Sequence, residues 1–136
     1  MRSRAPLALL EQLLMLLVFA VAAVICLRAF LWSDDASRRS AERDHAFACA
    51  QSAAEVLKSC GGDLDSAAAM LGGTAEEELW VISYDEAWNI ASAEERYTLR
   101  AAKLPPNGLL GCAEVTVTAG EKTLAALRVA WQEVSQ

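Results

Sequence analysis

The sequence predicts an α+β fold in which a long N-terminal helix, membrane-spanning in its first half, packs on a four- to five-stranded antiparallel sheet. Three observations lead to this prediction. An apolar run lies near the N-terminus, residues 7–60 contain no Gly or Pro, and residues 79–134 consist of short strand-like segments between turns. With 136 residues, 54% of them hydrophobic, the chain has room for one small domain with an appendage.

The N-terminal apolar segment covers residues 7–32 and predicts a transmembrane helix. Only Glu11, Gln12 and Arg28 interrupt it, and a bilayer core needs about 20 apolar residues in a helix. Arg28 lies near the end of the segment, where its long side chain reaches the headgroups, and Trp32 stands where an interfacial aromatic anchor is expected. A buried core helix and a cleaved secretory signal are the alternatives.

Charge is distributed unevenly along the chain. Residues 1–32 hold three basic and one acidic side chain, whereas residues 33–136 hold 9 basic and 17 acidic ones. The tail 1–6 is basic, which favours a cytoplasmic N-terminus and an extracytoplasmic C-terminal domain, although arginines at 38, 39 and 43 weigh against this orientation. The sequence pI of about 4.8 predicts no direct nucleic-acid binding, because phosphate contact requires a basic surface.

The start of the apolar segment carries a specific pattern. A basic tail that ends at Pro6 is followed by LALLEQLL at residues 7–14, so Glu11 is fifth when Leu7 is counted as first. This string resembles the N-terminus of type IV pilins and of the pseudopilins of type II secretion and competence systems. These proteins have a short basic leader, a cleavage point and an apolar helix with glutamate at its fifth position. The resemblance covers about the first quarter of the chain.

The resemblance implies an assembly role for the helix. In the family the glutamate pairs with the N-terminal amine of a neighbouring subunit, so Glu11 would hold homologous pilin-like subunits in register. A prepilin peptidase would cleave between Pro6 and Leu7, although Pro6 stands where the family has Gly. The chain would then be a minor pilin or pseudopilin in the cytoplasmic membrane, with a pilin-like long helix on a sheet. The alternative is a single-pass membrane-anchored protein whose external domain binds a ligand or partner.

Residues 33–60 are expected to continue the helix toward the C-terminal domain. The segment is rich in Ala, Arg, Glu and Gln, which are good helix formers. Apolar residues at helical spacing form one stripe along it: Ala46, Phe47, Cys49, Ala50, Ala53, Ala54, Val56 and Leu57. Gly61 and Gly62 predict the helix end, while Ser33–Asp35 offers an alternative break into two helices.

Residues 61–136 are expected to form a small α+β domain that packs on residues 46–60. A short helix is predicted over residues 63–71, with Asp63 as its cap, and Glu76–Glu78 predicts a solvated loop. Strands are expected at residues 79–84, 88–92, 97–104, 112–118 and 123–134, with a turn at 105–108. The last two strands form the clearest hairpin.

No group of residues supports an enzyme. The single histidine, His45, lies in a charged part of the helix and is expected to be a solvated surface residue. The sequence has no glycine-rich phosphate loop and no HExxH or CxxC motif, and it predicts neither a metal site nor a cofactor. Trp80, Trp88 and Trp131 fall in predicted strands and are expected to fill the core.

The four cysteines allow one disulfide prediction. Cys26 falls in the membrane helix, where it is a small apolar filler. Cys49 and Cys60 lie about 16 Å apart along a helix, too far to bond to each other. Either could bond to Cys112 if the sheet covers that helix face, and an extracytoplasmic domain would permit such a bridge. Free thiols are the alternative.

Overall fold

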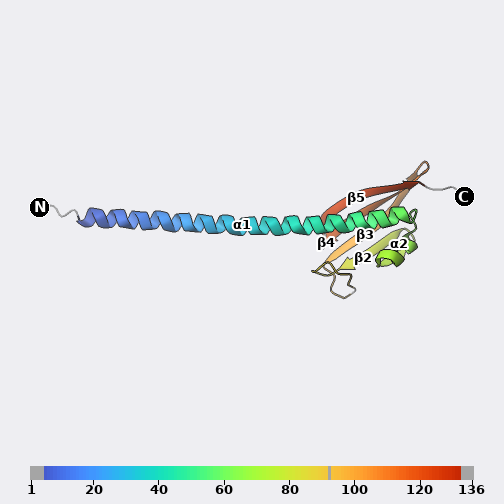
Figure 1. Cartoon of the computed structure of the whole chain (residues 1–136), viewed down its shortest axis with the longest axis horizontal. Coiled ribbons are helices and arrows are strands. Elements are labelled where there is room, and N and C mark those ends of the chain that lie inside the picture. The colour runs from blue at the N-terminus through green and yellow to red at the C-terminus, as the bar shows by residue number, and fades with distance from the viewer. Residues whose placement is uncertain (1–4, 92, 133–136) are drawn as a thin grey trace. The chain divides into compact units, whose positions relative to one another are not determined.

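The computed structural model describes residues 5–91 and 93–132 and has the predicted α+β architecture (Figure 1). Two helices and five strands follow one another along the chain: α1 (Ala5–Ser59), α2 (Leu64–Leu71), β1 (Thr74–Glu76), β2 (Leu79–Tyr84), β3 (Tyr97–Asn107), β4 (Leu110–Ala119) and β5 (Lys122–Gln132). The chain divides into two compact units, Met1–Ser40 and Ala41–Gln136, and α1 contributes to both.

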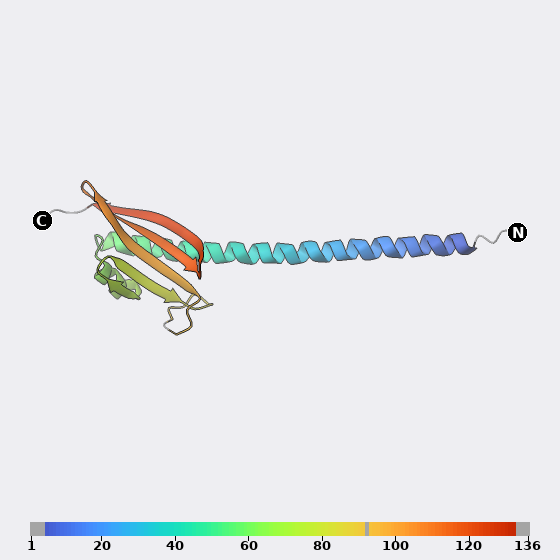
Figure 2. The same ribbon diagram turned by 180° about the vertical axis from the view of Figure 1, so that it is seen from behind.

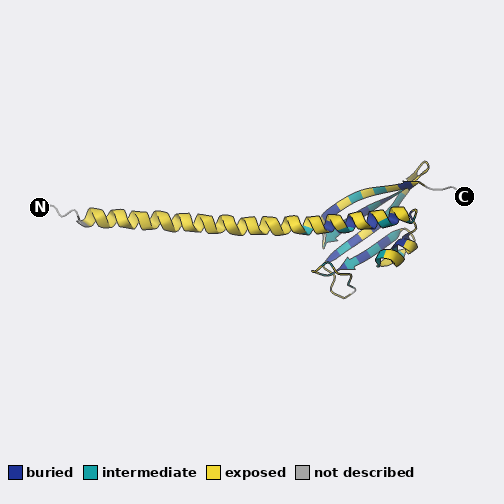
Figure 3. Cartoon of the chain, viewed as in Figure 1, coloured by how far each residue is buried: buried dark blue, intermediate teal, exposed yellow. Residues whose placement is uncertain are grey.

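The first unit consists of the N-terminal part of α1. Every described side chain from residue 6 to residue 41 is exposed, as the colouring in Figure 3 shows. The helix continues through Ser33–Asp35, so the alternative of two separate helices is excluded. The Nε of Arg38 lies 3.1 Å from the Oδ2 of Asp34 one turn earlier, which supports the helix where a break was conceivable.

The second unit forms one core between the last turns of α1 and the sheet (Figure 2). Ala46, Ala50 and Ala53 are completely buried, and Leu57 fills the space beyond them. These small side chains recur at successive turns, so an alanine face of the helix joins the sheet side chains in the core. Phe47, which was expected in this stripe, is instead 54% exposed, because it lies on the flank of the stripe rather than at its centre.

The sheet is an antiparallel meander in the order β1-β2-β3-β4-β5. Burial alternates along its central strands, so that one face of the sheet meets α1 and the other carries half-buried or exposed side chains. The largest completely buried side chains of the inner face come from three strands: Trp80, Ile82, Leu99, Val115 and Val117. The prediction of a long helix on a five-stranded sheet is therefore confirmed.

Two of the predicted local features are wrong. The strand predicted over residues 88–92 is absent from its described part, residues 88–91, where only a single bridge joins Ile90 to Tyr84. The predicted turn at 105–108 lies later, because β3 continues through both prolines to Asn107 and the chain turns at Gly108. Proline cannot donate to a ladder, and the β3–β4 register accordingly shifts between Leu104 and Asn107.

Two glycines end α1. The N–H of Gly62 donates to the carbonyl of Leu57 at 2.9 Å, and the N–H of Gly61 donates to that of Lys58 at 3.2 Å. This is the Schellman arrangement, with Gly61 in the left-handed conformation at φ +62°. Gly62, at φ +84°, lies against the indole of Trp131, and a Cβ added there would come within 2.2 Å of the ring. The Trp131 side chain therefore requires a glycine at position 62.

We expect Gly62→Ala to destabilise the second unit by about 2–4 kcal/mol, since it combines backbone strain with overpacking against Trp131. Gly61→Ala is the matched control. Gly61 also has a positive φ, but no atom lies within 4 Å of the added Cβ, so this variant should lose only about 1 kcal/mol of unfolding free energy. Urea unfolding of the full chain in mild detergent, followed by near-ultraviolet circular dichroism, measures both. Equal losses would contradict the proposed contact with Trp131.

Candidate functional site

The candidate site is the apolar part of α1, residues 7–32. At 1.5 Å per residue it is about 39 Å long, more than the roughly 30 Å of a bilayer core. The apolar stretch of this helix is 0% buried within the chain, whereas the core helix of a soluble protein is mostly buried. By length and composition this helix is able to cross a membrane, and a secretory signal would have the same properties.

Large hydrophobic side chains surround this part of the helix on all sides. Those more than half exposed include Leu7, Leu9, Leu10, Leu13, Leu14, Met15, Leu16, Leu17, Val18, Phe19, Val21, Val24, Ile25, Leu27, Phe30, Leu31 and Trp32. A helix that is apolar all round needs lipid or other protein around it, because soluble monomers rarely expose large contiguous apolar patches.

Glu11 is the single acidic residue of this segment. Among the described residues no basic side chain lies within ion-pair distance of its carboxylate. Arg28, the other charged residue of the segment, follows 17 positions later, about 25 Å along the axis. A carboxylate inside an apolar environment is costly unless it has a partner. Any protein partner for Glu11 inside a membrane or a helical bundle must therefore come from outside the described part of this chain.

One side of the helix has a shallow apolar depression. It is lined by Leu14, Met15, Val18, Phe19 and Ala22, which lie along the same face over about two turns. Ala22 leaves room beside the larger side chains for a side chain of another helix. Small residues at such positions allow close helix approach, so the depression has the form of a packing site for a second helix.

Arg28 and Trp32 lie one turn apart at the C-terminal end of the apolar segment. Both are exposed, and the Trp32 side chain is 80% exposed. The helix thus carries a cation and an amphipathic ring on one side, as the sequence predicts for residues at a membrane surface. Their role as interface anchors stays a prediction.

In the second unit, three rings stack where the β2–β3 loop meets α1. The ring centroids of Trp88 and Tyr97 lie 3.9 Å apart, with an angle of 6° between the ring planes. On the α1 side, the ring centroid of His45 lies 5.7 Å from that of Trp88. The Tyr97 hydroxyl donates to Glu42 Oε1 at 2.9 Å. His45 is exposed, as predicted, and one face of its ring also stacks on the Trp88 indole, a contact that the sequence did not predict. Trp88 lies in a loop rather than in a strand.

The loop around Trp88 is held in a strained conformation. Trp88 has φ +63°, a value that costs about 1–2 kcal/mol for a non-glycine residue. The Oδ1 of Asp85 accepts hydrogen bonds from the backbone N–H groups of Ala87 at 2.9 Å and Asn89 at 2.8 Å. The bonds from Asn89 and Ala87 also hold the pKa of the Asp85 carboxyl below its ordinary value. Stacking and these bonds together fasten the loop to α1.

The predicted bridge from Cys112 to Cys49 or Cys60 is not formed, and all four cysteines are free thiols. Cys112 alternates with the buried Gly111 and Ala113 on β4, which places its side chain on the face opposite α1. Cys49 lies on the inner side, and burial raises the pKa of its thiol. Cys60 instead meets Met70 of α2, with 3.6 Å between the two sulfur atoms.

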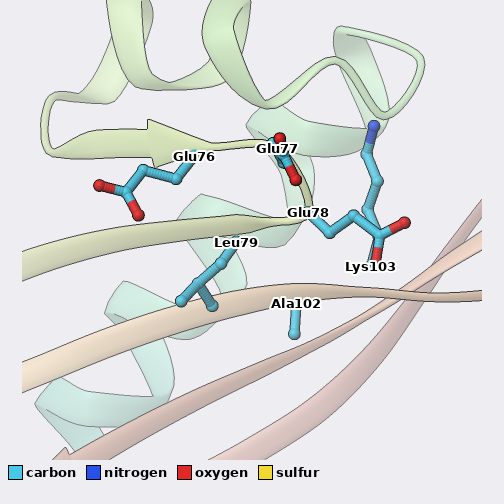
Figure 4. A pocket seen from close by; sticks show the side chains of 6 residues that line it. All are labelled: Glu76, Glu77, Glu78, Leu79, Ala102 and Lys103. Carbon is cyan, nitrogen blue, oxygen red and sulfur yellow. The ribbon is translucent and has the colours of Figure 1, made fainter.

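Glu76–Glu78 marks one corner of the sheet. Glu76 ends β1 and the other two form the turn into β2, so the predicted solvated loop is partly strand. All three side chains are exposed, and Figure 4 shows those of Glu76 and Glu78 extending away from each other around a notch that Lys103 also lines. Carboxylates that diverge in this way present a charged surface rather than a closed ligand set.

In residues 5–91 and 93–132 no three His, Cys, Asp or Glu side chains gather in a way that could hold a metal ion. The comparison with known protein families, with curated proteins and with solved structures finds no match for this chain. Its function must therefore be inferred from its own surfaces, of which the apolar part of α1 is the most unusual.

We expect alkaline pH to destabilise the second unit through Tyr84. Burial, together with the neighbouring Cys49, raises the pKa of the Tyr84 phenol to about 12. The phenol thus holds its proton more tightly in the folded protein than in the unfolded chain. The contribution of Tyr84 to the free energy of unfolding is therefore complete below pH about 10 and is lost as the pH rises toward about 12. The unfolding free energy should fall by about 2–3 kcal/mol over this range.

Urea unfolding at a series of pH values measures this loss, and Tyr84→Phe should remove most of it. Tyr97→Phe is the comparison variant. Burial and the bond to Glu42 also raise the pKa of Tyr97, but that variant leaves Tyr84 in place, so most of the alkaline loss should remain. If the unfolding free energy of Tyr84→Phe falls with alkaline pH as steeply as that of the original chain, Tyr84 is not the cause of the loss.

Proposed function

We propose that this chain is a structural subunit of a bacterial envelope assembly of the pilin or pseudopilin type. The observation that carries the proposal is the exposed apolar segment of α1 with Glu11 at its fifth position from Leu7. A minor subunit of a type IV pilus-like, type II secretion-like or competence machine would use such a helix in two environments. Lipid would surround it before assembly, and the helices of neighbouring subunits would surround it afterwards.

Glu11 gives this helix a means of selecting one register. Apolar side chains pack with little preference for axial position, because lipid and neighbouring helices are similarly apolar. A carboxylate that must meet a cationic group, such as the N-terminal amine of the next subunit, restricts the axial shift to one value. The depression next to Ala22 would receive a side chain of the neighbouring helix in that register.

The charge distribution suggests the orientation in the membrane. We place the N-terminus in the cytoplasm and residues 33–136 outside, because the tail before the helix is basic and free of acidic residues. In this arrangement Arg28 and Trp32 would lie at the outer membrane–water interface. The chain would be a single-pass protein of the cytoplasmic membrane until its incorporation into an assembly.

We expect Glu11→Gln to reduce assembly by about tenfold or more while leaving membrane insertion intact, since the change removes a charge but keeps the size of the side chain. Shearing of the cell surface followed by sedimentation measures assembled subunit, and carbonate extraction measures insertion. Glu55→Gln, an exposed change on the same helix, is the matched control and should behave like the original chain. Assembly that survives Glu11→Gln would favour the alternative, a membrane-anchored protein with an external ligand- or partner-binding domain.

The N-terminus of the protein in its native membranes gives a separate test. Intact mass and N-terminal sequencing should show a chain that begins at Leu7, processed after Pro6 by a prepilin peptidase. A start at Met1 would mean a permanent anchor without the free amine that Glu11 requires. A start near Ala23 would identify the segment as a secretory signal and would overturn the proposal.

A further inference from the structure

The outward face of the sheet contains a groove that no described element covers. Glu95, Arg96, Thr98, Arg100, Thr116, Thr118 and Gly120 line it, and its volume is about 560 Å³. Thr98 and Arg100 on β3 alternate with buried residues, as Thr116 does on β4, so they face away from α1. Such a face of a small domain is open for contact with another molecule.

Two arginines give this groove its character. Among the described residues neither Arg96 nor Arg100 has a carboxylate within ion-pair distance, and both are exposed. Glu95 also lines the groove, but its carboxylate accepts the hydroxyl hydrogen bond of Thr98. Threonine side chains separate the charges, so the floor is polar and shallow. The groove therefore suits an extended segment with acidic side chains.

A segment of this kind is present at the other end of the same sheet. Glu76, Glu77 and Glu78 are exposed at the β1–β2 turn and have no ion-pair partner among the described residues. The turn precedes Leu79 at the start of β2, where Leu79 pairs with Ala102 of β3. The groove lies toward the other end of this ladder, where Thr98 of β3 pairs with Ser83 of β2. One copy cannot bring the turn into its own groove, because the two occupy different ends of the β2–β3 ladder.

We propose that the groove of one copy binds the Glu76–Glu78 turn of a second copy. This inference rests on the proposed function, because the α1 helices would bring the copies together and raise the local concentration of each turn. Residues 33–136 carry 9 basic and 17 acidic side chains, so most contacts between copies are repulsive. Pairing the arginine groove with the acidic turn is the contact that relieves this repulsion.

The proposed contact is head-to-tail, since two different surfaces meet. A contact of this type does not close on itself after two copies and instead continues to further copies, in a closed ring or in an open row. The same arrangement would repeat at each step of an assembly built on α1.

Cross-linking of the full chain in its native membranes tests the contact. Two differently tagged variants are produced together after replacement of the four native cysteines by Ala, one with Thr116→Cys in the groove and one with Glu77→Cys in the turn. A short bis-maleimide should join the two tags. Glu55→Cys in place of Glu77→Cys is the exposed control and should give little product.

Charge reversal tests the physical basis. Arg96→Glu with Arg100→Glu on the groove chain should lower the heterologous product by about tenfold, because attraction is replaced by repulsion. Glu76→Arg with Glu78→Arg on the turn chain should restore most of it. Product that is unaffected by reversal, or a groove that cross-links to a different protein instead, would overturn the proposal. Near-ultraviolet circular dichroism of each variant verifies that it is folded.

A second reporter separates this contact from assembly through α1. Ala22→Cys in the same cysteine-free chain should give helix-to-helix product wherever α1 packs against α1. Helix product without groove product would overturn the groove contact and leave the proposed function standing. Groove product that persists in Glu11→Gln would support the contact and contradict a Glu11-dependent assembly. The absence of both products would overturn both proposals.

Discussion

The packing of the alanine face of α1 against the inner face of the sheet is the contact on which the second unit depends. A meander of five strands has one apolar face and needs an element to cover it. Ala46, Ala50 and Ala53 join Trp80 and Leu99 of the sheet in one core, in which all of these side chains are completely buried. The same helix continues toward the N-terminus through the charged residues 33–45 into the apolar segment 7–32. A single element therefore contributes to the core of the domain and carries the surface that we propose for assembly.

The two ends of the domain core are closed by different means. Near Glu42 and His45, the stacked Trp88 and Tyr97 rings fasten a strained loop to α1. At the helix C-terminus, Trp131 lies against Gly62, where only a glycine leaves room for the indole. Each closure depends on a side chain meeting a residue far away in the sequence.

Local sequence was sufficient for the features that depend on near neighbours. The apolar run, the absence of Gly and Pro, and the Gly61–Gly62 stop predicted α1 correctly, and strand alternation predicted most of the sheet. The errors arose where distant residues decide the outcome. Phe47 has the right spacing but lies on the flank of the stripe, and Trp88 leaves the expected strand because rings from α1 and β3 stack on it. Of the candidate site, the position and exposure of Glu11 were predictable from the sequence. A charge partner for Glu11 was not, because no basic side chain among the described residues lies within ion-pair distance of its carboxylate.

The distribution of charge between the two units has a consequence for any assembly. An apolar helix with one carboxylate attracts copies through packing and a single charge pair, and lipid competes with the packing term. Residues 33–136 oppose the close approach of copies through their excess of acidic side chains. A balance of this kind makes association sensitive to where the few basic side chains lie. Arg96 and Arg100 lie together on an open sheet face, and the Glu76–Glu78 turn, which shares its notch with Lys103, lies at the opposite end of the ladder. Copies that bring these surfaces together have less electrostatic repulsion than copies in other arrangements, so the domains would select among the arrangements that α1 permits.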